Sequence, residues 1–176
     1  KNDGDKLSNR KYDKEDDLAL SALGEVLTIK LVEQLREEEG GVYGVGARGN
    51  MSEIPYDSYN FSISFPCGPE NVDKLTKAAL AEVEKLRTEG PTEEDLAKVK
   101  ETFKVQRKEQ LQENQFWMQQ LRKAEEEGFK LSEISKFNEM VDDLEAEELQ
   151  ELAEEFLGSN YLLGVLMPET EEASAE

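Results

Sequence analysis

A regular amphipathic pattern lies between residues 17 and 39, where apolar side chains recur at every third or fourth position. One stripe consists of Leu20, Leu23, Leu27, Leu31 and Leu35. A second stripe beside it consists of Ala19, Ala22, Val26 and Ile29. Two adjacent stripes give a wide apolar surface, so we expect a largely buried helix. Asp16 or Asp17 is suited to cap its start, and Gly40 is suited to end it.

Two strand-like segments follow this helix. Residues 42–50 are rich in glycine, which permits another backbone to approach closely. Residues 56–65 alternate, so that aromatic and aliphatic side chains point to one side while serine and asparagine side chains point to the other. The apolar members are Tyr59, Phe61, Ile63 and Phe65. This alternation predicts an antiparallel strand with one covered face, joined to the first strand by a turn at residues 51–55.

Helical periodicity returns at residues 70–89 and is broken by Gly90 and Pro91. Thr92 is placed to cap the next helix, with Asp95 three residues later in the capping-box position. These signals predict two consecutive helices that meet at a sharp turn.

The helix that starts after Thr92 is expected to continue to about residue 127, where Gly128 ends it. Its apolar seam is interrupted in the middle by side-chain amides. The interrupting residues are Gln106, Gln110 and Asn114. This interruption predicts either a bend or a segment that faces a wet cavity. Phe116 and Trp117 beyond it belong either to the core or to the lining of a chamber.

The remaining pattern indicates short helices at residues 132–141 and 145–157 and a short apolar strand at residues 160–167. The expected fold class is therefore α+β, with helices packed on one face of an antiparallel sheet. We expect a polar lead-in at residues 1–16, a single domain at 17–168 and a disordered acidic tail at 169–176. A strand before residue 17 is expected but the sequence there does not alternate, which suggests that the chain begins inside a domain.

Charge narrows the classes of partner. The chain has 176 residues, 21 basic and 41 acidic side chains, and a formal net charge of −20. An acidic surface of this strength repels phosphate backbones and anionic lipid, so neither nucleic acid nor a membrane surface is an expected partner. No run approaches the roughly 20 apolar residues of a membrane-spanning helix. The amino-terminal residues contain no apolar segment of signal-peptide type.

The metal-ligating and nucleophilic residue types are scarce. Histidine is absent and Cys67 is the single cysteine. This composition excludes an intrachain disulfide, a cysteine-rich zinc site and a Cys–His nucleophile pair. It leaves open a carboxylate-only metal site, although no calcium-loop motif is present. We therefore predict no metal site and no resident cofactor in this chain.

The segment from residue 35 to residue 46 reads LREEEGGVYGVG and combines a fixed cation with a phenol. Arg36 ends the apolar helix, and Tyr43 starts the glycine-rich strand seven residues later. A guanidinium and a neutral phenol can together hold a peptide carbonyl or a developing oxyanion. The same pair also has an ordinary structural explanation, because an arginine suits a helix carboxyl end and a tyrosine suits a strand.

With these elements in this order, the chain resembles the C-terminal half of the pitrilysin/insulinase family of zinc metallopeptidases, close to its bacterial members. The resemblance covers roughly residues 17–168. Its strongest motif is Leu35-Arg36 followed by Gly41 and Tyr43. The segments GPTEEDLAKVK (90–100) and ENQFWMQQL (113–121) also match the late helices of this family.

The resemblance implies a substrate-binding domain whose parent hydrolyses peptide bonds. It implies that Tyr43 donates to the scissile carbonyl, while Arg36 holds a nearby carbonyl or orients Tyr43. Arg48 and Asn50, on the strand that would face the peptide, are expected to bind substrate. The substrate, a peptide or unfolded polypeptide, would lie as an added strand on a sheet edge.

The family's zinc is bound by a His-x-x-Glu-His motif in the other half. A chain without histidine cannot hold that zinc, so we expect these 176 residues to be inactive alone. The zinc would lie in an N-terminal domain of the same polypeptide or in a partner subunit. The likeness to bacterial members also implies a periplasmic or cell-envelope parent.

Two other functions stay open. The first is a non-catalytic scaffold of the same fold, in which the parent's other half lacks the zinc motif. The second is an acidic helical adaptor with no enzyme connection, which predicts that residues 42–50 and 56–65 do not pair as strands.

Overall fold

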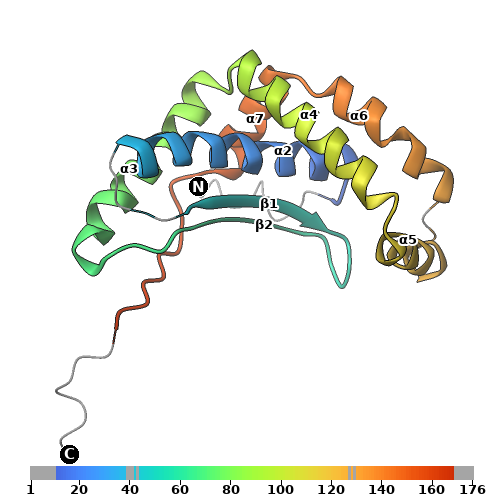
Figure 1. Ribbon diagram of the computed structural model, residues 1–176, viewed down its shortest axis with the longest axis horizontal. Coiled ribbons are helices and arrows are strands. Elements are labelled where there is room, and N and C mark those ends of the chain that lie inside the picture. The colour runs from blue at the N-terminus through green and yellow to red at the C-terminus, as the bar shows by residue number, and fades with distance from the viewer. Residues whose placement is uncertain (1–10, 39–41, 43, 127, 129, 169–176) are drawn as a thin grey trace, which may run out of the picture.

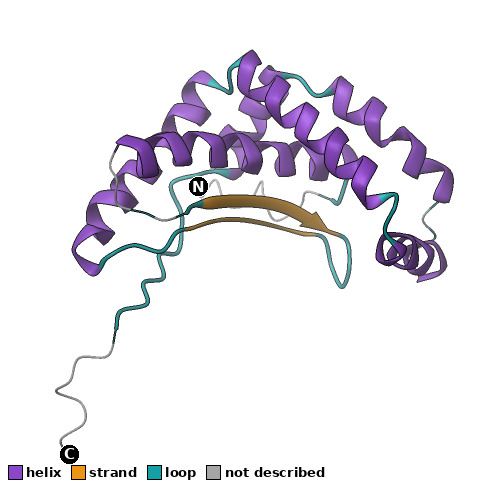
Figure 2. Ribbon diagram, in the orientation of Figure 1, coloured by secondary structure: helices purple, strands orange, loops and turns teal. Residues whose placement is uncertain are grey.

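The computed structural model describes residues 11–38, 42, 44–126, 128 and 130–168. In chain order its elements are α2 (Lys14–Leu31), η1 (Val32–Glu38), β1 (Gly46–Ser52), β2 (Ser58–Ser64), η2 (Pro69–Asn71), α3 (Val72–Glu89), α4 (Glu93–Gln110), α5 (Asn114–Glu126), η3 (Leu131–Lys136), α6 (Phe137–Asp143) and α7 (Ala146–Phe156). Helix α2 lies on the two-stranded antiparallel sheet, and α3, α4, α6 and α7 pack around α2 (Figures 1 and 2). The predicted α+β class is confirmed, and the strand pairing rejects the all-helical adaptor.

Helix α2 is the centre of the core. All five leucines of the predicted stripe are completely buried, as are Ala19, Ala22 and Val26 of the second stripe. The helix begins at Lys14 because Asp13, rather than Asp16 or Asp17, is its N-cap. The Asp13 carboxylate accepts hydrogen bonds from the backbone N–H groups of Glu15 and Asp16 at 2.8 and 3.3 Å. The helix then widens into the π-helix η1, which ends at Glu38. Gly40, its predicted end, lies outside the described residues.

Two glycines allow α2 and β1 to approach closely. A Cβ atom added to Gly49 of β1 would lie 2.5 Å from the carbonyl oxygen of Leu20. A Cβ atom added to Gly24 of α2 would lie 2.9 Å from the backbone nitrogen of Gly49. Neither distance leaves room for a side chain. The prediction that the glycine-rich strand permits close approach of another backbone is therefore confirmed.

The register of the sheet explains why β1 lies later than predicted. Gly46 pairs with Ser64 at one end of the ladder, and Ser52 pairs with Ser58 at the other. The first strand therefore extends further than expected, and the turn lies at residues 53–57 rather than at residues 51–55. Val42, at the start of the predicted strand, forms only an isolated bridge to Cys67.

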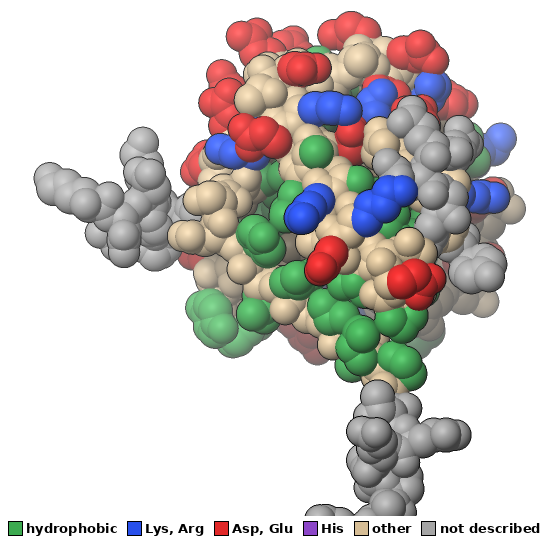
Figure 3. Space-filling model, turned by 90° about the vertical axis from the view of Figure 1, so that its left-hand side faces the viewer, with side chains coloured by type: hydrophobic (Ala, Val, Ile, Leu, Met, Phe, Trp, Pro, Cys, Tyr) green, Lys and Arg blue, Asp and Glu red, His purple; other side chains and the backbone are tan. Residues whose placement is uncertain are grey.

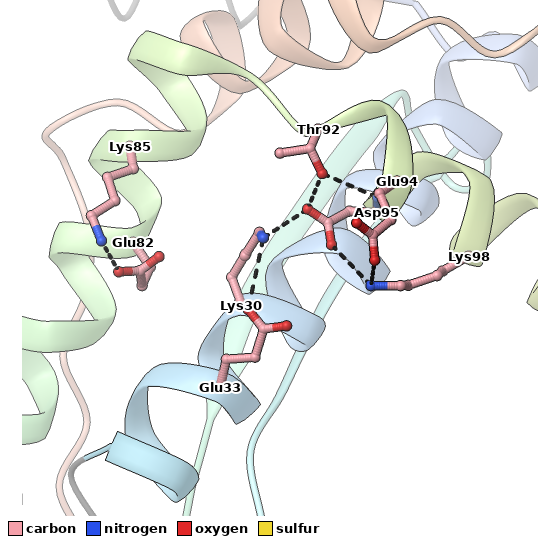
Figure 4. Close-up of polar contacts among 8 residues, drawn as sticks. All are labelled: Lys30, Glu33, Glu82, Lys85, Thr92, Glu94, Asp95 and Lys98. Atoms are coloured by element: carbon pink, nitrogen blue, oxygen red, sulfur yellow. Dashed lines mark hydrogen bonds and ion pairs between the residues drawn. The ribbon is translucent and has the colours of Figure 1, made fainter.

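The junction between α3 and α4 has the predicted signals. Gly90 has a φ of 73°, a left-handed value that favours glycine. The backbone N–H of Asp95 donates to the Thr92 hydroxyl at 3.1 Å, as in a capping box, whereas the Asp95 carboxylate accepts from the Thr92 hydroxyl rather than from the Thr92 backbone N–H. Figure 4 shows that the buried Asp95 carboxylate also contacts Lys30 of α2, at 2.7 Å. This ion pair connects the start of α4 to the central helix.

The prediction of one continuous helix up to about residue 127 is wrong, because this stretch forms two helices, α4 and α5. Three residues, 111–113, separate the two helices, and the indole N–H of Trp117 donates to the Leu111 carbonyl at 2.9 Å. The amide-rich segment therefore ends one helix, and Gln106 and Gln110 also line a cleft. Phe116 is buried, whereas Trp117 is 41% exposed.

The predicted strand at residues 160–167 is wrong, because this segment is an extended coil without a partner among the described residues. Leu162 is 97% exposed and Leu166 is fully exposed. Figure 3 shows hydrophobic side chains gathered at the end of the molecule from which this segment leaves the body. A strand requires backbone pairing with a neighbouring strand, and residues 160–167 pair with neither β1 nor β2.

Candidate functional site

Arg36 lies where the central helix ends. It belongs to the last turn of η1 and is exposed to solvent, whereas its neighbour Leu35 is completely buried. The buried leucine packs in the core, so the exposed guanidinium is carried by a turn whose inner side is part of the core. Short π-helical turns occur frequently at functional sites, because the wider turn changes the direction in which side chains point.

Tyr43, the predicted partner of Arg36, lies outside the described residues. Its sequence neighbour Val42 is 8% exposed and forms the bridge to Cys67. The backbone immediately before Tyr43 is thus attached to the segment that follows β2.

Arg48 and Asn50 lie on the face of β1 that points away from α2, and both are exposed. Their cross-strand partners on β2 are the exposed Ser62 and Asn60. These four residues make a polar outer face of the sheet. Arg36 does not lie beside these four residues. The backbone of Arg48 packs against Gly24 of α2. Arg36 is twelve residues after Gly24 along the helix, a distance of roughly 18 Å at about 1.5 Å per residue.

The outer edge of β1 is occupied by polar side chains of α2. The Thr28 hydroxyl accepts from the N–H of Ala47 at 2.8 Å, and the Ser21 hydroxyl donates to the carbonyl of Gly49 at 3.1 Å. The Asp17 carboxylate accepts from the N–H of Met51 at 2.6 Å. Burial raises the pKa of Asp17 and this hydrogen bond opposes the increase. A further strand could pair with this edge only by displacing these side chains, because the N–H groups of Ala47 and Met51 and the C=O groups of Ala47 and Gly49 already have partners.

The outer edge of β2 has the opposite character. In an antiparallel pair, residues whose backbone groups point away from the partner strand face one another. The backbone N–H and C=O groups of Ala47, Gly49 and Met51 point away from β2, towards α2. The backbone groups of their cross-strand partners therefore point away from β1, to the outer edge of β2. These partners are Ile63, Phe61 and Tyr59. Within the described part of the chain, this is the sheet edge at which a strand can be added.

The zinc that the resemblance implies does not fit the residues of this chain. The sequence contains no histidine, and Cys67 is a free thiol. Among the described residues, no group of three or more aspartate, glutamate or cysteine side chains is arranged to hold a metal ion. We therefore assign no zinc-dependent step to this chain. Also within the described residues, no helix is long and apolar enough to cross a membrane.

Comparison with known proteins is consistent with this arrangement of helices and strands. A model of the peptidase M16 inactive domain matches residues 6–103, which is more than half of the chain. The chain belongs to the peptidase M16 inactive domain family. The resemblance predicted from Arg36, Tyr43 and the order of elements is thereby confirmed at the level of the family.

Individual relatives agree with this assignment. The chain is 33% identical over 104 residues to a zinc protease PQQL-like protein of Arabidopsis thaliana, an alignment that covers 56% of this chain and 11% of the relative. Its fold matches the periplasmic protease PqqL of Escherichia coli with a TM-score of 0.68 and 18% identity, over 85% of this chain and 16% of PqqL. It also matches a mutant of the ferredoxin protease FusC, solved in complex with Arabidopsis ferredoxin, with a TM-score of 0.65 and 16% identity, over 83% and 16% of the two chains.

The chain thus spans between a tenth and a fifth of the length of these relatives. The comparisons identify the chain as a domain related to zinc proteases, and they identify the fold of M16 carboxy-terminal domains.

Proposed function

We propose that this chain is the substrate-binding domain of a zinc metallopeptidase, in which Arg36 and Tyr43 contact the peptide bond to be cleaved. The observation that carries the proposal is the exposed Arg36 beside the buried Leu35 at a helix end, in a member of the M16 family. The phenol of Tyr43 donates a hydrogen bond to the carbonyl oxygen as negative charge develops on it. Arg36 provides a charged, forked donor for a neighbouring carbonyl of the same peptide.

The substrate class is a peptide or unfolded polypeptide, and the relatives support this choice. FusC is a protease and was solved with a protein, ferredoxin. An extended peptide binds through its backbone when it adds to a sheet edge. The outer edge of β2 is the edge with unpartnered backbone groups in the described residues, so either a peptide or a further strand of the parent protein pairs there. Arg48 and Asn50 on the outer face of the sheet then contact side chains of the added strand.

A zinc-bearing domain or subunit is the necessary partner. This chain has no residues that fit zinc, so the metal and its activated water come from an N-terminal domain or another subunit of the parent. Alone, the 176 residues cleave no peptide.

The test uses the parent protein and an internally quenched peptide substrate. Tyr43→Phe removes one hydroxyl and leaves the ring, and loss of an oxyanion donor typically lowers kcat by about a hundredfold to a thousandfold. We expect a fall of this size in kcat with a small change in KM. Tyr56→Phe is the matched control, because Tyr56 is 71% exposed in the hairpin turn and removal of its hydroxyl leaves activity unchanged.

An unchanged kcat in Tyr43→Phe would refute the oxyanion role. Arg36→Gln tests the second residue, and we expect it to increase KM because it weakens contact with the bound peptide. If the parent cleaves no peptide and its other half lacks His-x-x-Glu-His, the domain is a scaffold and the whole proposal is wrong.

A further inference from the structure

A cleft of about 490 Å³ lies between the start of α2, the carboxyl end of α4, α5 and the η3–α6 segment. Figure 1 shows α5 at the end of the molecule near the β1–β2 hairpin, beside the η3 segment that leads into α6. We call this feature the Arg107 cleft. Its described lining contains Arg107, Lys123, Lys130 and Lys14, three acidic residues, three glutamines and an apolar wall. The cleft and Arg36 lie at opposite ends of the α2–η1 helix. Leu18, which lines the cleft, is eighteen residues before Arg36, a distance of roughly 27 Å at about 1.5 Å per residue.

The charge of Arg107 has no anionic partner among the described residues. Its guanidinium carbon lies 3.7 Å from the ring centroid of Phe137 and 5.1 Å from that of Phe116. Its Nε is buried without a hydrogen-bond acceptor. Arg87 also has a buried Nε without an acceptor, but its Nη1 pairs with Glu84 at 2.5 Å. Two rings therefore hold Arg107 in place without neutralising it.

Partial burial makes this charge costly. Burial removes part of the hydration of the guanidinium, and this loss lowers the pKa of Arg107. Cation–π contacts with the two rings attract the charge but do not neutralise it. A cation in this state binds an anion more strongly than an exposed lysine or arginine does.

The local balance of charge is opposite to that of the whole chain. Four lining side chains are basic and three are acidic, although the chain has 21 basic and 41 acidic residues. Glu133 pairs with Lys14 and also interacts with the charge of Lys130, and the charge of Asp17 is opposed by that of Lys123. The lining therefore carries a small excess of positive charge, and Arg107 is the cation in it that has no carboxylate partner among the described residues. The cleft attracts an anionic group within a protein whose surface otherwise repels anions.

The other lining residues favour a peptide over a phosphate compound. Gln106, Gln110 and Gln120 can each donate to and accept from an amide, which suits the backbone of a peptide. Phe103, Ile134 and Met140 provide an apolar wall for a side chain. The guanidinium fork matches a carboxylate with two parallel hydrogen bonds. A polyphosphate would gain nothing from the apolar wall and would be repelled by Glu53 and by the net charge.

We propose that the Arg107 cleft is a binding site for a carboxylate group of a peptide, with the guanidinium of Arg107 as its principal ligand and the glutamines as contacts for the adjoining peptide bonds. The carboxylate belongs either to the peptide's carboxyl terminus or to an acidic side chain. The site is independent of the pair at residues 36 and 43, because it requires neither zinc nor peptide cleavage.

The experiment uses the 176-residue chain and isothermal titration calorimetry. The probes are N-acetyl-Leu-Ala-Ala-Phe with a free carboxyl terminus, the same peptide as its terminal amide, N-acetyl-Leu-Glu-Ala-Phe-amide, and inorganic phosphate. Fluorescence is a second readout, since the chain's single tryptophan, Trp117, has its ring 5.5 Å from Phe116, which contacts Arg107. We expect one or both carboxylate peptides to bind at least about tenfold more tightly than the plain amide, the size of a charge-assisted hydrogen bond.

Arg107→Gln should reduce the affinity for the carboxylate peptide by about tenfold or more. The matched control is Arg122→Gln on α5, which removes the same charge from a side chain outside the lining that pairs with Glu126. It should leave the affinity within about twofold. If Arg107→Gln does not fold, Arg107→Lys keeps the charge but loses the fork, and it should still weaken binding.

Three results would overturn the proposal. The first is equal affinity for the carboxylate peptides and the plain amide, including no binding of any of them. The second is an equal loss of affinity in the variants at positions 107 and 122. The third is tighter binding of inorganic phosphate than of either carboxylate peptide. Which of the two carboxylate peptides binds more tightly identifies the source of the carboxylate.

Discussion

Replacement of Gly49 by alanine tests whether the contact between α2 and β1 depends on the absence of a side chain. The new Cβ atom would lie 2.5 Å from the carbonyl oxygen of Leu20 and 2.7 Å from its Cγ atom. Non-bonded heavy atoms attract one another at about 3.5–4.0 Å, so α2 and β1 must separate by about 1 Å. The obstacle is backbone in a helix whose inner face is completely buried, and it has no alternative rotamer.

Overpacking of a core typically costs about 1–3 kcal/mol, occasionally more. We expect the upper part of this range, because the displaced helix contacts the sheet and four other helices. Urea unfolding monitored by circular dichroism measures the change. With an m-value of about 2 kcal/mol per molar urea, the midpoint should fall by about 1 M or more.

Gly46→Ala is the matched control in the same strand. A Cβ atom at Gly46 meets no atom within 4 Å. The control should therefore be neutral or slightly stabilising, since alanine restricts the unfolded chain more than glycine does. A difference of less than about 0.5 kcal/mol between the two variants would refute the argument from close approach, because that is the size of an ordinary surface substitution.

Two further predictions concern polar contacts of α2. Thr28→Val keeps the shape of the side chain but leaves the N–H of buried Ala47 without its acceptor, so stability should fall by about 1–3 kcal/mol and that amide should exchange with solvent faster. Burial alone would raise the pKa of Asp95, but hydrogen bonds from Lys30 and Thr92 outweigh it and lower the pKa. Asp95 therefore stabilises the fold above the unfolded carboxyl pKa of about 3.9, and this contribution disappears as the pH falls through the lower folded pKa. Asp95→Asn should destabilise by about 1–3 kcal/mol at neutral pH, with a difference that shrinks below about pH 4 in urea titrations; a constant difference from neutral pH to pH 3 would contradict this assignment.

Local patterns were sufficient for most elements. The leucine stripe of α2, the alternation in β2 and the cap at Thr92 each depend on a period or on a contact between residues close in sequence. Such signals are present in the chain itself, because helix and strand geometry fix which positions share a face. The helix cap was misplaced because residues 13, 16 and 17 are all aspartates, and only the backbone conformation selects one of them.

The errors concern partners that are distant in sequence. Residues 160–167 have the apolar composition of a strand, but they pair with neither β1 nor β2, and the outer edge of β1 is occupied by side chains of α2. Those side chains belong to Asp17, Ser21 and Thr28. In the sequence they occupy ordinary polar positions of an amphipathic helix, so the pattern gives no sign of their contacts with β1. Their role depends on backbone groups about 20 to 35 residues further along the chain.

The sequence by itself determined the class of fold, the family and the absence of histidine, because these depend on periodicity, motif order and composition. The tertiary structure decided which sheet edge is open, how closely α2 and β1 approach, and that the charge of Arg107 contacts two rings and has no carboxylate partner among the described residues. Arg107 reads as one more basic residue on a charged helix. Phe137, which covers it, lies thirty residues away, and folding alone brings the two together, since nothing in the local spacing couples them.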